Sequence, residues 1–101
     1  MPQRFQNCIG GEGRDAEGGA VFENRNPSRL AEILGLFPDS GAADVDRAVR
    51  AGREAFLRWR EITPPERGRL LFRAGQLLDA RREELSRVLS RENGKTVRSA
   101  L

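Results

Sequence analysis

The residue types that could do chemistry are few in this chain. Cys8 is the only cysteine and the only strong nucleophile. A catalytic thiol needs a base or a cation beside it to form the thiolate, and the 101 residues include no histidine. We therefore expect Cys8 to be a small, half-buried hydrophobic residue on a strand. A single cysteine also excludes an internal disulfide and a cysteine-based zinc site.

Two glycine-containing segments invite comparison with phosphate-binding loops. Residues 10–13 read Gly-Gly-Glu-Gly, but the third glycine of G-x-G-x-x-G is missing and no helical pattern follows. We expect a hairpin turn there. Residues 94–96 read Gly-Lys-Thr, like the end of a P-loop, but Leu89 stands where the first glycine of that loop belongs. This second segment is expected to end a helix.

Neighbouring acidic residues could in principle act as an acid and a base. Asp44 with Asp46, and Glu83 with Glu84, have spacings that do not share a helix face. We expect all four to be solvated charges. Trp59 ends an apolar stripe and is expected to be a core residue or an interface anchor. The residue types therefore predict no catalytic, cofactor-binding or metal-binding residue.

The charge distribution argues against a nucleic-acid-binding protein. The chain has 18 Lys+Arg and 15 Asp+Glu, with a net charge of −2 in residues 1–41 and +5 in residues 42–101. Opposite signs are interleaved in the second half, as in residues 81–84, which is typical of solvated helix faces. The first seven residues are polar, and no apolar stretch approaches the ~18 residues that span a bilayer. We expect a cytoplasmic protein without nucleic-acid or membrane partners.

The elements that position these side chains begin with short strands in residues 1–39. Apolar runs there are brief and are separated by the turn-forming dipeptides Gly10-Gly11, Gly18-Gly19 and Asn26-Pro27. Strands are predicted over residues 5–9, 21–25 and 31–37, with a weak partner for the first after Gly11. The third is the strongest, because large apolar residues fill it and Pro38 stops it.

From residue 40 onward the apolar period becomes helical. A helix over residues 44–60 is predicted, with Ser40 as its N-cap. Its apolar stripe consists of Val45, Val49, Gly52, Phe56 and Trp59.

A second and longer helix is predicted over residues 64–92. Thr63 and Glu66 have the spacing of a capping box, and proline follows Thr63 at the first helical position. Gly94 is expected to end this helix. Thr96 then resembles the cap of a further helix, which stops at Leu101 before completing two turns.

Together these elements predict an α+β fold. Short N-terminal β-hairpins and strands in residues 1–39 are followed by a long antiparallel helical hairpin in residues 40–101. The second helix would be roughly 40 Å long, beyond the ~26 Å diameter of a globule of this size. We therefore expect residues 1–101 to be a single partial domain whose helix faces lack partners.

Unpartnered helix faces predict self-association. Each large apolar side chain left in water forgoes roughly 1.5–3 kcal/mol, and the strand region is too small to cover both stripes. We expect a homo-oligomer with an even number of copies, formed through these apolar faces. The residues involved are Phe56, Trp59, Leu70, Leu71, Leu78, Leu85 and Val88.

A series of short motifs resembles the N-terminal segment of the NAD(P)-dependent aldehyde dehydrogenase superfamily. Each motif is weak alone, but the order and spacing are specific, and the resemblance covers essentially the whole chain. The motifs are Ile-Gly-Gly-Glu at 9–12, Asn-Pro at 26–27, residues 33–38, Asp-Val-Asp-Arg-Ala-Val at 44–49, residues 55–60, Glu-Arg at 66–67, Leu-Leu at 77–78, Glu-Glu-Leu at 83–85 and Glu-Asn-Gly-Lys at 92–95.

This resemblance implies a scaffold role for the chain. In the family, the Rossmann-like site for NAD or NADP, the catalytic cysteine and the general-base glutamate all lie downstream of the matched region. Cys8 is not the family nucleophile, and no functional residue is carried over. We therefore expect this chain to bind no cofactor and to be inactive alone, although the family oxidises aldehydes to carboxylic acids.

Two hypotheses for the function remain open. In the first, the chain is the beginning of an aldehyde dehydrogenase whose activity requires the missing domains. In the second, it is a standalone self-associating module, a truncated relative of the family. The length of 101 residues favours the second, and the resemblance favours the first as ancestry. The aldehyde is not indicated by the sequence.

Overall fold

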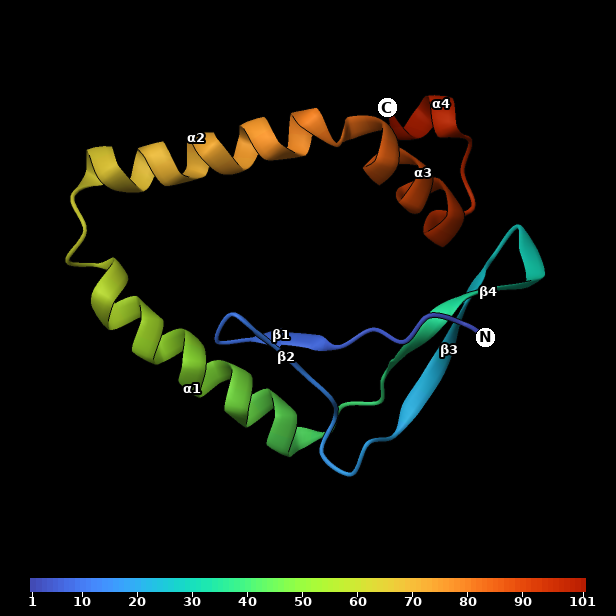
Figure 1. Ribbon diagram of the computed structural model, residues 1–101, viewed down its shortest axis with the longest axis horizontal. Helices are drawn as coiled ribbons and strands as arrows, with labels where there is room; N and C mark the ends of the chain where they lie inside the picture. The colour runs from blue at the N-terminus through green and yellow to red at the C-terminus, as the bar shows by residue number, and fades with distance from the viewer. The chain divides into compact units, whose positions relative to one another are not determined.

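The chain folds into four short strands followed by four helices (Figure 1). The computed structural model describes residues 1–101. The strands are β1 (Asn7–Ile9), β2 (Glu12–Arg14), β3 (Val21–Asn26) and β4 (Arg29–Pro38). The helices are α1 (Ala42–Trp59), α2 (Pro64–Ala80), α3 (Arg82–Asn93) and α4 (Val97–Ala100). The predicted α+β class is confirmed.

The elements group into two compact units. The first contains Met1–Asn24 and Ile33–Glu61, and the second contains Arg25–Glu32 and Ile62–Leu101. The first unit holds β1, β2, α1 and residues 21–24 and 33–38 of β3 and β4. The second holds the β3–β4 turn and the helices α2 to α4. Because α1 and α2 belong to different units, the antiparallel helical hairpin and the single partial domain stay predictions.

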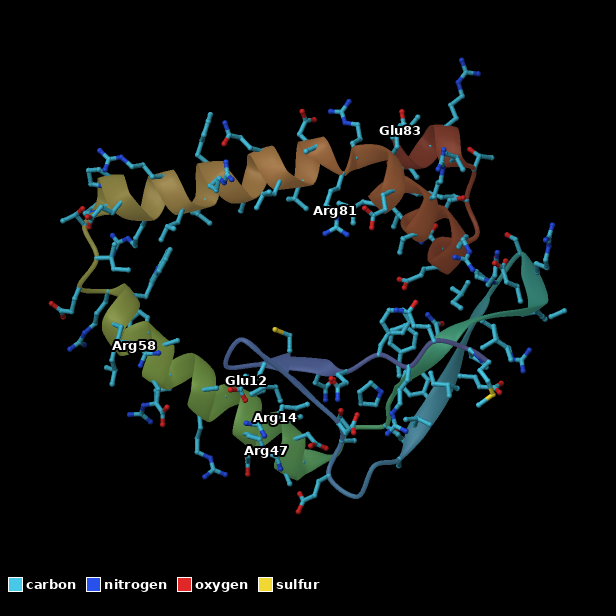
Figure 2. All side chains as sticks on the ribbon, viewed as in Figure 1. Glu12, Arg14, Arg47, Arg58, Arg81 and Glu83 are labelled. Atoms are coloured by element: carbon cyan, nitrogen blue, oxygen red, sulfur yellow. The ribbon has the colours of Figure 1, made fainter.

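The first hairpin forms because two consecutive glycines adopt positive φ. Gly10 has φ of 62° and Gly11 has φ of 80°, and Ile9 pairs directly with Glu12. A two-residue loop with this geometry matches the right-handed twist of its strands. The turn predicted at residues 10–13 is therefore confirmed. Glu12 and Arg14 lie on β2 and form an ion pair at 2.7 Å (Figure 2).

A small aromatic cluster packs the first unit. Phe5 stacks on Phe37 with ring centroids 4.7 Å apart, and Phe22 lies 6.0 Å from Phe37. The N-terminal segment is held in place by backbone hydrogen bonds to β4, from Phe5 N–H to the Leu36 carbonyl and from Leu36 N–H to the Gln3 carbonyl. The buried Gly35 leaves space for the Phe5 ring, which a side chain would fill.

Helix α1 begins one residue later than Ser40 would place it. Gly41 is the N-cap, and the Asp44 carboxylate accepts the Gly41 N–H at 3.0 Å. The prediction of Ser40 as the cap is wrong, because its hydroxyl instead accepts a hydrogen bond from the Asn7 side chain at 2.8 Å. The acidic residue in the first turn compensates for the absence of a side chain on Gly41.

The prediction of one helix over residues 64–92 is wrong, because the chain bends at Arg81. Arg81 has φ of −106° and ψ of 16°, which separates α2 from α3. The hydrogen-bond series nevertheless continues through the bend, since the Arg81 N–H is shared by the Leu77 and Leu78 carbonyls. The Ser86 hydroxyl donates to the Arg82 carbonyl at 2.7 Å, a contact of the kind that bends helices.

The ends of the second unit follow the predicted caps. The Thr63 N–H and hydroxyl both donate to Glu66 at the start of α2. Gly94 ends α3 with φ of 80°, and Thr96 caps α4 by accepting the Ser99 N–H. These three expectations are confirmed.

Both long helices expose apolar side chains. No large side chain is fully buried in either unit. The exposed apolar residues include Val45, Val49 and Phe56 on α1, and Leu70, Leu71, Leu77 and Leu78 on α2. Trp59 is 36% exposed. None of the helices combines the length and apolar character needed to cross a membrane.

Candidate functional site

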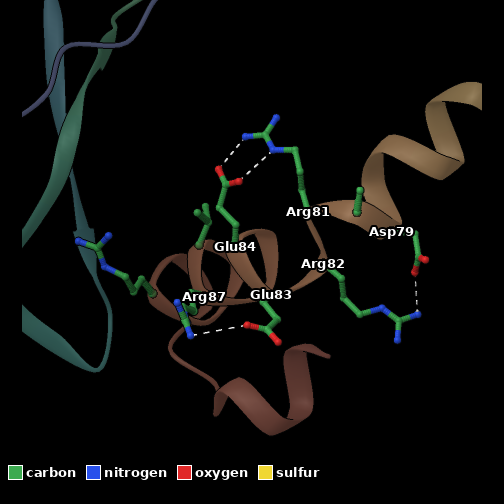
Figure 3. Close-up of a pocket in the computed structure, with 9 residues that line it drawn as sticks. Asp79, Arg81, Arg82, Glu83, Glu84 and Arg87 are labelled. Atoms are coloured by element: carbon green, nitrogen blue, oxygen red, sulfur yellow. Dashed lines mark hydrogen bonds and ion pairs between the residues drawn. The ribbon is translucent and has the colours of Figure 1, made fainter.

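A concave surface lies where α2 meets α3, and Figure 3 shows it. It is an open depression of about 810 Å³ within the second unit. Arginine and carboxylate side chains dominate its lining, which consists of Asp79, Ala80, Arg81, Arg82, Glu83, Glu84, Arg87, Val88 and Arg91.

Ion pairs organise this depression. The Arg81 guanidinium donates twice to Glu84, from Nε to Oε2 at 2.9 Å and from Nη2 to Oε1 at 2.6 Å. These hydrogen bonds lower the pKa of Glu84 and raise that of Arg81. Arg82 pairs with Asp79 across the bend at 3.3 Å. Glu83 and Glu84 are both solvent-exposed, as expected, and Glu84 also forms an ion pair with Arg81 at the bend.

The depression has no machinery for catalysis. Its lining contains no cysteine, serine, lysine or histidine, and Glu84 has a lowered pKa, the opposite of a general acid held protonated near neutrality. Glu83 lies 3.9 Å from Arg87 at the solvent-exposed rim. Arginines already occupied by carboxylates make a poor site for an added anion. We therefore assign it a structural role at the bend.

A second charged cluster joins the β3–β4 turn to α3 within the second unit. Glu32 accepts hydrogen bonds from the Asn26 amide at 2.8 Å and from the Arg91 Nε at 2.8 Å. The Asn26 hydrogen bond, followed by that of Arg91, lowers the pKa of Glu32. Nearby, the Ser28 hydroxyl donates to the Gly94 carbonyl at 2.7 Å. Sequence patterns do not indicate these contacts, because 59 and 66 residues separate the partners.

Asp44 is buried, which contradicts the expectation of a solvated charge. Only 3% of it is exposed, whereas Asp46 on the same helix is exposed. Its carboxylate accepts the Gly41 N–H at 3.0 Å and the Glu17 N–H at 2.9 Å. These two hydrogen bonds lower the pKa of Asp44, the Gly41 contribution being the larger. A buried carboxylate satisfied in this way joins the 16–19 turn to α1 and is not poised for proton transfer.

Cys8 and the two glycine-containing segments do not form a common site. Cys8 lies on β1 with its thiol exposed, so the expectation that it is half-buried is wrong. Residues 10–13 form the hairpin turn and continue into a strand, and residues 94–96 end one helix and cap the next. Within residues 1–101, no three of the side chains that commonly bind metals form a cluster.

The solved structures that this chain resembles are aldehyde dehydrogenases. The fold matches an NAD-dependent aldehyde dehydrogenase from Sinorhizobium meliloti with a TM-score of 0.92 and 35% identity, over 99% of this chain and 20% of that one. The NAD+ complex of an aldehyde dehydrogenase from Bacillus cereus matches equally, with a TM-score of 0.92 and 35% identity over 98% of this chain and 20% of that one.

Sequence relatives agree with the structural neighbours. Malonate-semialdehyde dehydrogenase 2 of Geobacillus kaustophilus is 40% identical over 98 residues, which are 97% of this chain and 20% of the relative. D-glyceraldehyde dehydrogenase (NADP(+)) of Picrophilus torridus is 38% identical over 93 residues, 92% of this chain and 19% of the relative. The profile of the aldehyde dehydrogenase family matches residues 14–101. The chain belongs to the aldehyde dehydrogenase family.

The match is confined to one part of these relatives. The chain spans about a fifth of the length of the curated relatives that it matches. The glycines at 10–13 do not form the kind of turn that binds a dinucleotide. The glycines at 10–13 make a strand–turn–strand hairpin, whereas a dinucleotide pyrophosphate binds where a glycine-rich turn leads into a helix.

Proposed function

We propose that this chain is the N-terminal structural segment of an NAD(P)-dependent aldehyde dehydrogenase. The observation that carries the proposal is the TM-score of 0.92 over 99% of this chain but only 20% of its structural neighbour. In this proposal the enzyme oxidises an aldehyde to a carboxylic acid with hydride transfer to NAD(P), and residues beyond this segment perform that reaction.

The role of the segment is to support the rest of the enzyme. The apolar stripes of α1 and α2 are exposed, and burial of each large side chain is worth roughly 1.5–3 kcal/mol. The proposed enzyme covers these stripes with its remaining four fifths. The segment in turn presents α1 and α2 as preformed surfaces, because the Asp44 and Thr63–Glu66 hydrogen bonds define where each helix begins.

By itself the chain is proposed to be inactive and to bind neither NAD nor NADP. Two features support this. The only thiol, Cys8, is exposed on a hairpin and has no histidine to activate it. The glycine-containing segments form a β-turn and a helix C-terminus, and neither presents a row of backbone N–H groups to a phosphate.

An alternative function is a standalone module that self-associates. The same exposed apolar side chains favour it, because a second copy could cover them if no further domains do. The expected state is then an even-numbered homo-oligomer. The cytoplasmic location also stays a prediction.

Three measurements on the purified chain test these proposals. Calorimetric titration with NAD+ and NADP+ should give no saturable binding, and malonate semialdehyde with either cofactor should give no reduced nicotinamide. Saturable binding at micromolar concentration would show that a cofactor site was missed. Light scattering over a concentration series then separates the two functions, since a stable, monodisperse oligomer favours the standalone module, whereas aggregation or partial unfolding favours a segment that lacks its partner.

A further inference from the structure

Asn93 and Gly94 form the one Asn-Gly sequence in the chain, at the point where α3 ends. In such a sequence the backbone nitrogen of the second residue readily attacks the side-chain amide of the first, because glycine has no side chain to hinder the approach. The attack converts the asparagine to an acid and needs neither an enzyme nor a cofactor. Asn93 is therefore a candidate modification site that the proposed function does not use.

The other three asparagines lack these features. The side-chain amides of Asn7 and Asn26 each donate a hydrogen bond at 2.8 Å. Asn26 is also followed by proline, whose nitrogen carries no proton, and Asn24 is followed by the bulkier arginine. Asn93 by contrast is solvent-exposed, and its side-chain amide has no hydrogen-bond partner. The reactive sequence and the free amide thus coincide at one position.

The folded chain holds the attacking nitrogen away from the Asn93 side chain. The Gly94 N–H donates to the Ser90 carbonyl at 2.8 Å, which closes the last turn of α3. In this geometry the N–H points back along the helix. Attack on Cγ of Asn93 requires rotation about its ψ angle, and that rotation breaks the hydrogen bond to Ser90. The reaction therefore requires the last turn of α3 to open.

Contacts within the second unit oppose this opening. The Ser28 hydroxyl donates to the Gly94 carbonyl at 2.7 Å, and the Ser90 hydroxyl donates to the Lys95 carbonyl at 2.6 Å. The β3–β4 turn also lies close against the helix end. A Cβ atom on Gly94 would lie 2.6 Å from the Ser28 hydroxyl oxygen and 2.9 Å from a Pro27 carbon. The turn therefore holds the last residues of α3 in the unreactive conformation.

We propose that Asn93 is a deamidation site whose reaction is controlled by the contact between the β3–β4 turn and Gly94. When the last turn of α3 opens, the Gly94 nitrogen bonds to Cγ of Asn93, and the bond from Cγ to Nδ2 breaks. The side-chain nitrogen leaves as ammonia with the proton of the Gly94 N–H. Water then adds to either carbonyl of the succinimide ring and opens it to aspartate or isoaspartate. No electrons are transferred, so the reaction needs only water.

The product changes the end of α3 irreversibly. A carboxylate at position 93 lies at the negative end of the helix dipole, which disfavours the helical conformation there. Isoaspartate also routes the main chain through its side-chain carbon, which adds one backbone atom before Gly94. The Gly94 carbonyl then moves relative to the Ser28 hydroxyl. Deamidation therefore loosens the same contact that had protected Asn93.

Ageing of the full chain tests the site. The chain is incubated at mildly alkaline pH, both folded and unfolded in guanidinium chloride, and peptide mapping by mass spectrometry follows all four asparagines. The proposal expects Asn93 to convert first in the unfolded chain, and to convert roughly tenfold or more slowly in the folded chain. An unreactive Asn93 in the unfolded chain, or equal rates in the two states, would overturn the proposal.

Ser28→Ala tests the control by the turn. Loss of this hydroxyl should raise the rate at Asn93 in the folded chain by roughly two- to tenfold, the increase in opening that loss of one hydrogen bond produces. Ser40→Ala, in the first unit, is the matched control and should leave the rate unchanged. Circular dichroism establishes that each variant is folded. If Ser28→Ala does not fold, Arg91→Ala supplies the test, because the Arg91–Glu32 contact holds the same turn. A folded variant that reacts at the rate of the parent chain contradicts the control by the turn.

Hydrogen exchange of the aged chain tests the consequence. The fraction that contains isoaspartate at position 93 should show lower protection of the amides of residues 25–32 than the fresh chain. Asn93→Asp, which adds the charge without the extra backbone atom, should show a smaller loss. Unchanged protection in the isoaspartate fraction would contradict the link between Asn93 and the turn.

Discussion

The guanidinium of Arg91 on α3 binds the carboxylate of Glu32, which lies 59 residues earlier in the chain. Nε and Nη2 of Arg91 lie 2.8 and 2.7 Å from the same oxygen, Oε1, while Asn26 occupies Oε2. This contact joins the β3–β4 turn to the C-terminal part of α3. The turn therefore depends on a side chain from a distant helix as well as on its own strands.

Replacing Arg91 by alanine should loosen the β3–β4 turn. Without the guanidinium, Glu32 keeps only the Asn26 hydrogen bond, so backbone amides of residues 25–32 should exchange hydrogen faster. Arg87→Ala is the matched control on the same helix, because Arg87 makes only an exposed contact of 3.9 Å with Glu83. Equal exchange rates in the two variants would show that the Arg91 contact does not order the turn.

The pH dependence of the same contact follows from the lowered pKa of Glu32. A carboxyl group whose pKa is lower in the folded state contributes stability that is present above its unfolded pKa. That contribution is lost as the pH falls through the lower, folded value. Protection factors of the amides in residues 25–32, which correct for the intrinsic pH dependence of exchange, should thus fall below about pH 4.5, the ordinary value for Glu, and a Glu32→Gln chain should lack this fall.

Asp44→Asn should destabilise the first unit far more than Asp46→Asn. Asp44 is buried and accepts two backbone N–H groups, and an amide in its place presents a donor to one of them. Asp46 is exposed on the same helix. Because the pKa of Asp44 is lowered, the stability difference between the parent chain and Asp44→Asn should shrink on acidification below pH 3.8. Denaturant midpoints of the two chains are measured over this pH range. A difference between them that stays constant with pH would contradict the role given to the Asp44 carboxylate.

Thr63→Ala should lower the free energy of unfolding by about 1 kcal/mol, because α2 loses its N-terminal capping residue. The hydroxyl and N–H of Thr63 both donate to Glu66, so the loss from Glu66→Ala should overlap with it. The double variant should then lose less than the sum of the two single changes. Arg58→Ala, on an exposed position of α1, should stay within about 0.5 kcal/mol. Urea unfolding curves measure whether Thr63→Ala or Arg58→Ala loses more free energy of unfolding, and an equal or larger loss for Arg58→Ala would contradict the assigned cap.

Gly94→Ala and Gly52→Ala should change stability in opposite directions. Gly94 has φ of 80°, and a Cβ there would lie 2.6 Å from the Ser28 hydroxyl and 2.9 Å from a Pro27 carbon. We expect a loss of more than about 1 kcal/mol. Gly52 lies inside α1 with open space around it, so alanine should stabilise the helix by about 0.5–1 kcal/mol. A stabilised Gly94→Ala chain would contradict the close approach of α3 to the turn.

Local features of the fold could be predicted from the sequence where a few adjacent residues determine the conformation. Gly10-Gly11 favours positive φ at both positions, and Thr63 with Glu66 defines a helix start whatever surrounds it. The bend at Arg81 could not be predicted in this way. The apolar spacing and the backbone hydrogen bonds both continue through it, and the change affects the φ and ψ of a single residue.

Charged contacts between distant segments also escaped sequence analysis. Asp44 was placed correctly in the first turn of α1, but its burial depends on the 16–19 turn, which adds the Glu17 N–H. Nothing near Glu32 in the sequence identifies Arg91 as its partner. The Ser28–Gly94 hydrogen bond likewise requires the folded second unit.

A chimeric enzyme tests the central proposal most directly. In it, this chain replaces the matched N-terminal region of malonate-semialdehyde dehydrogenase 2 from Geobacillus kaustophilus, and the same enzyme lacking that region is the control. If the chain is a structural segment without chemistry of its own, the chimera should oxidise malonate semialdehyde with kcat and KM of the same order as the parent, and the shortened enzyme should be inactive. A folded chimera without activity, or a shortened enzyme that keeps the parent's activity, would contradict the proposal.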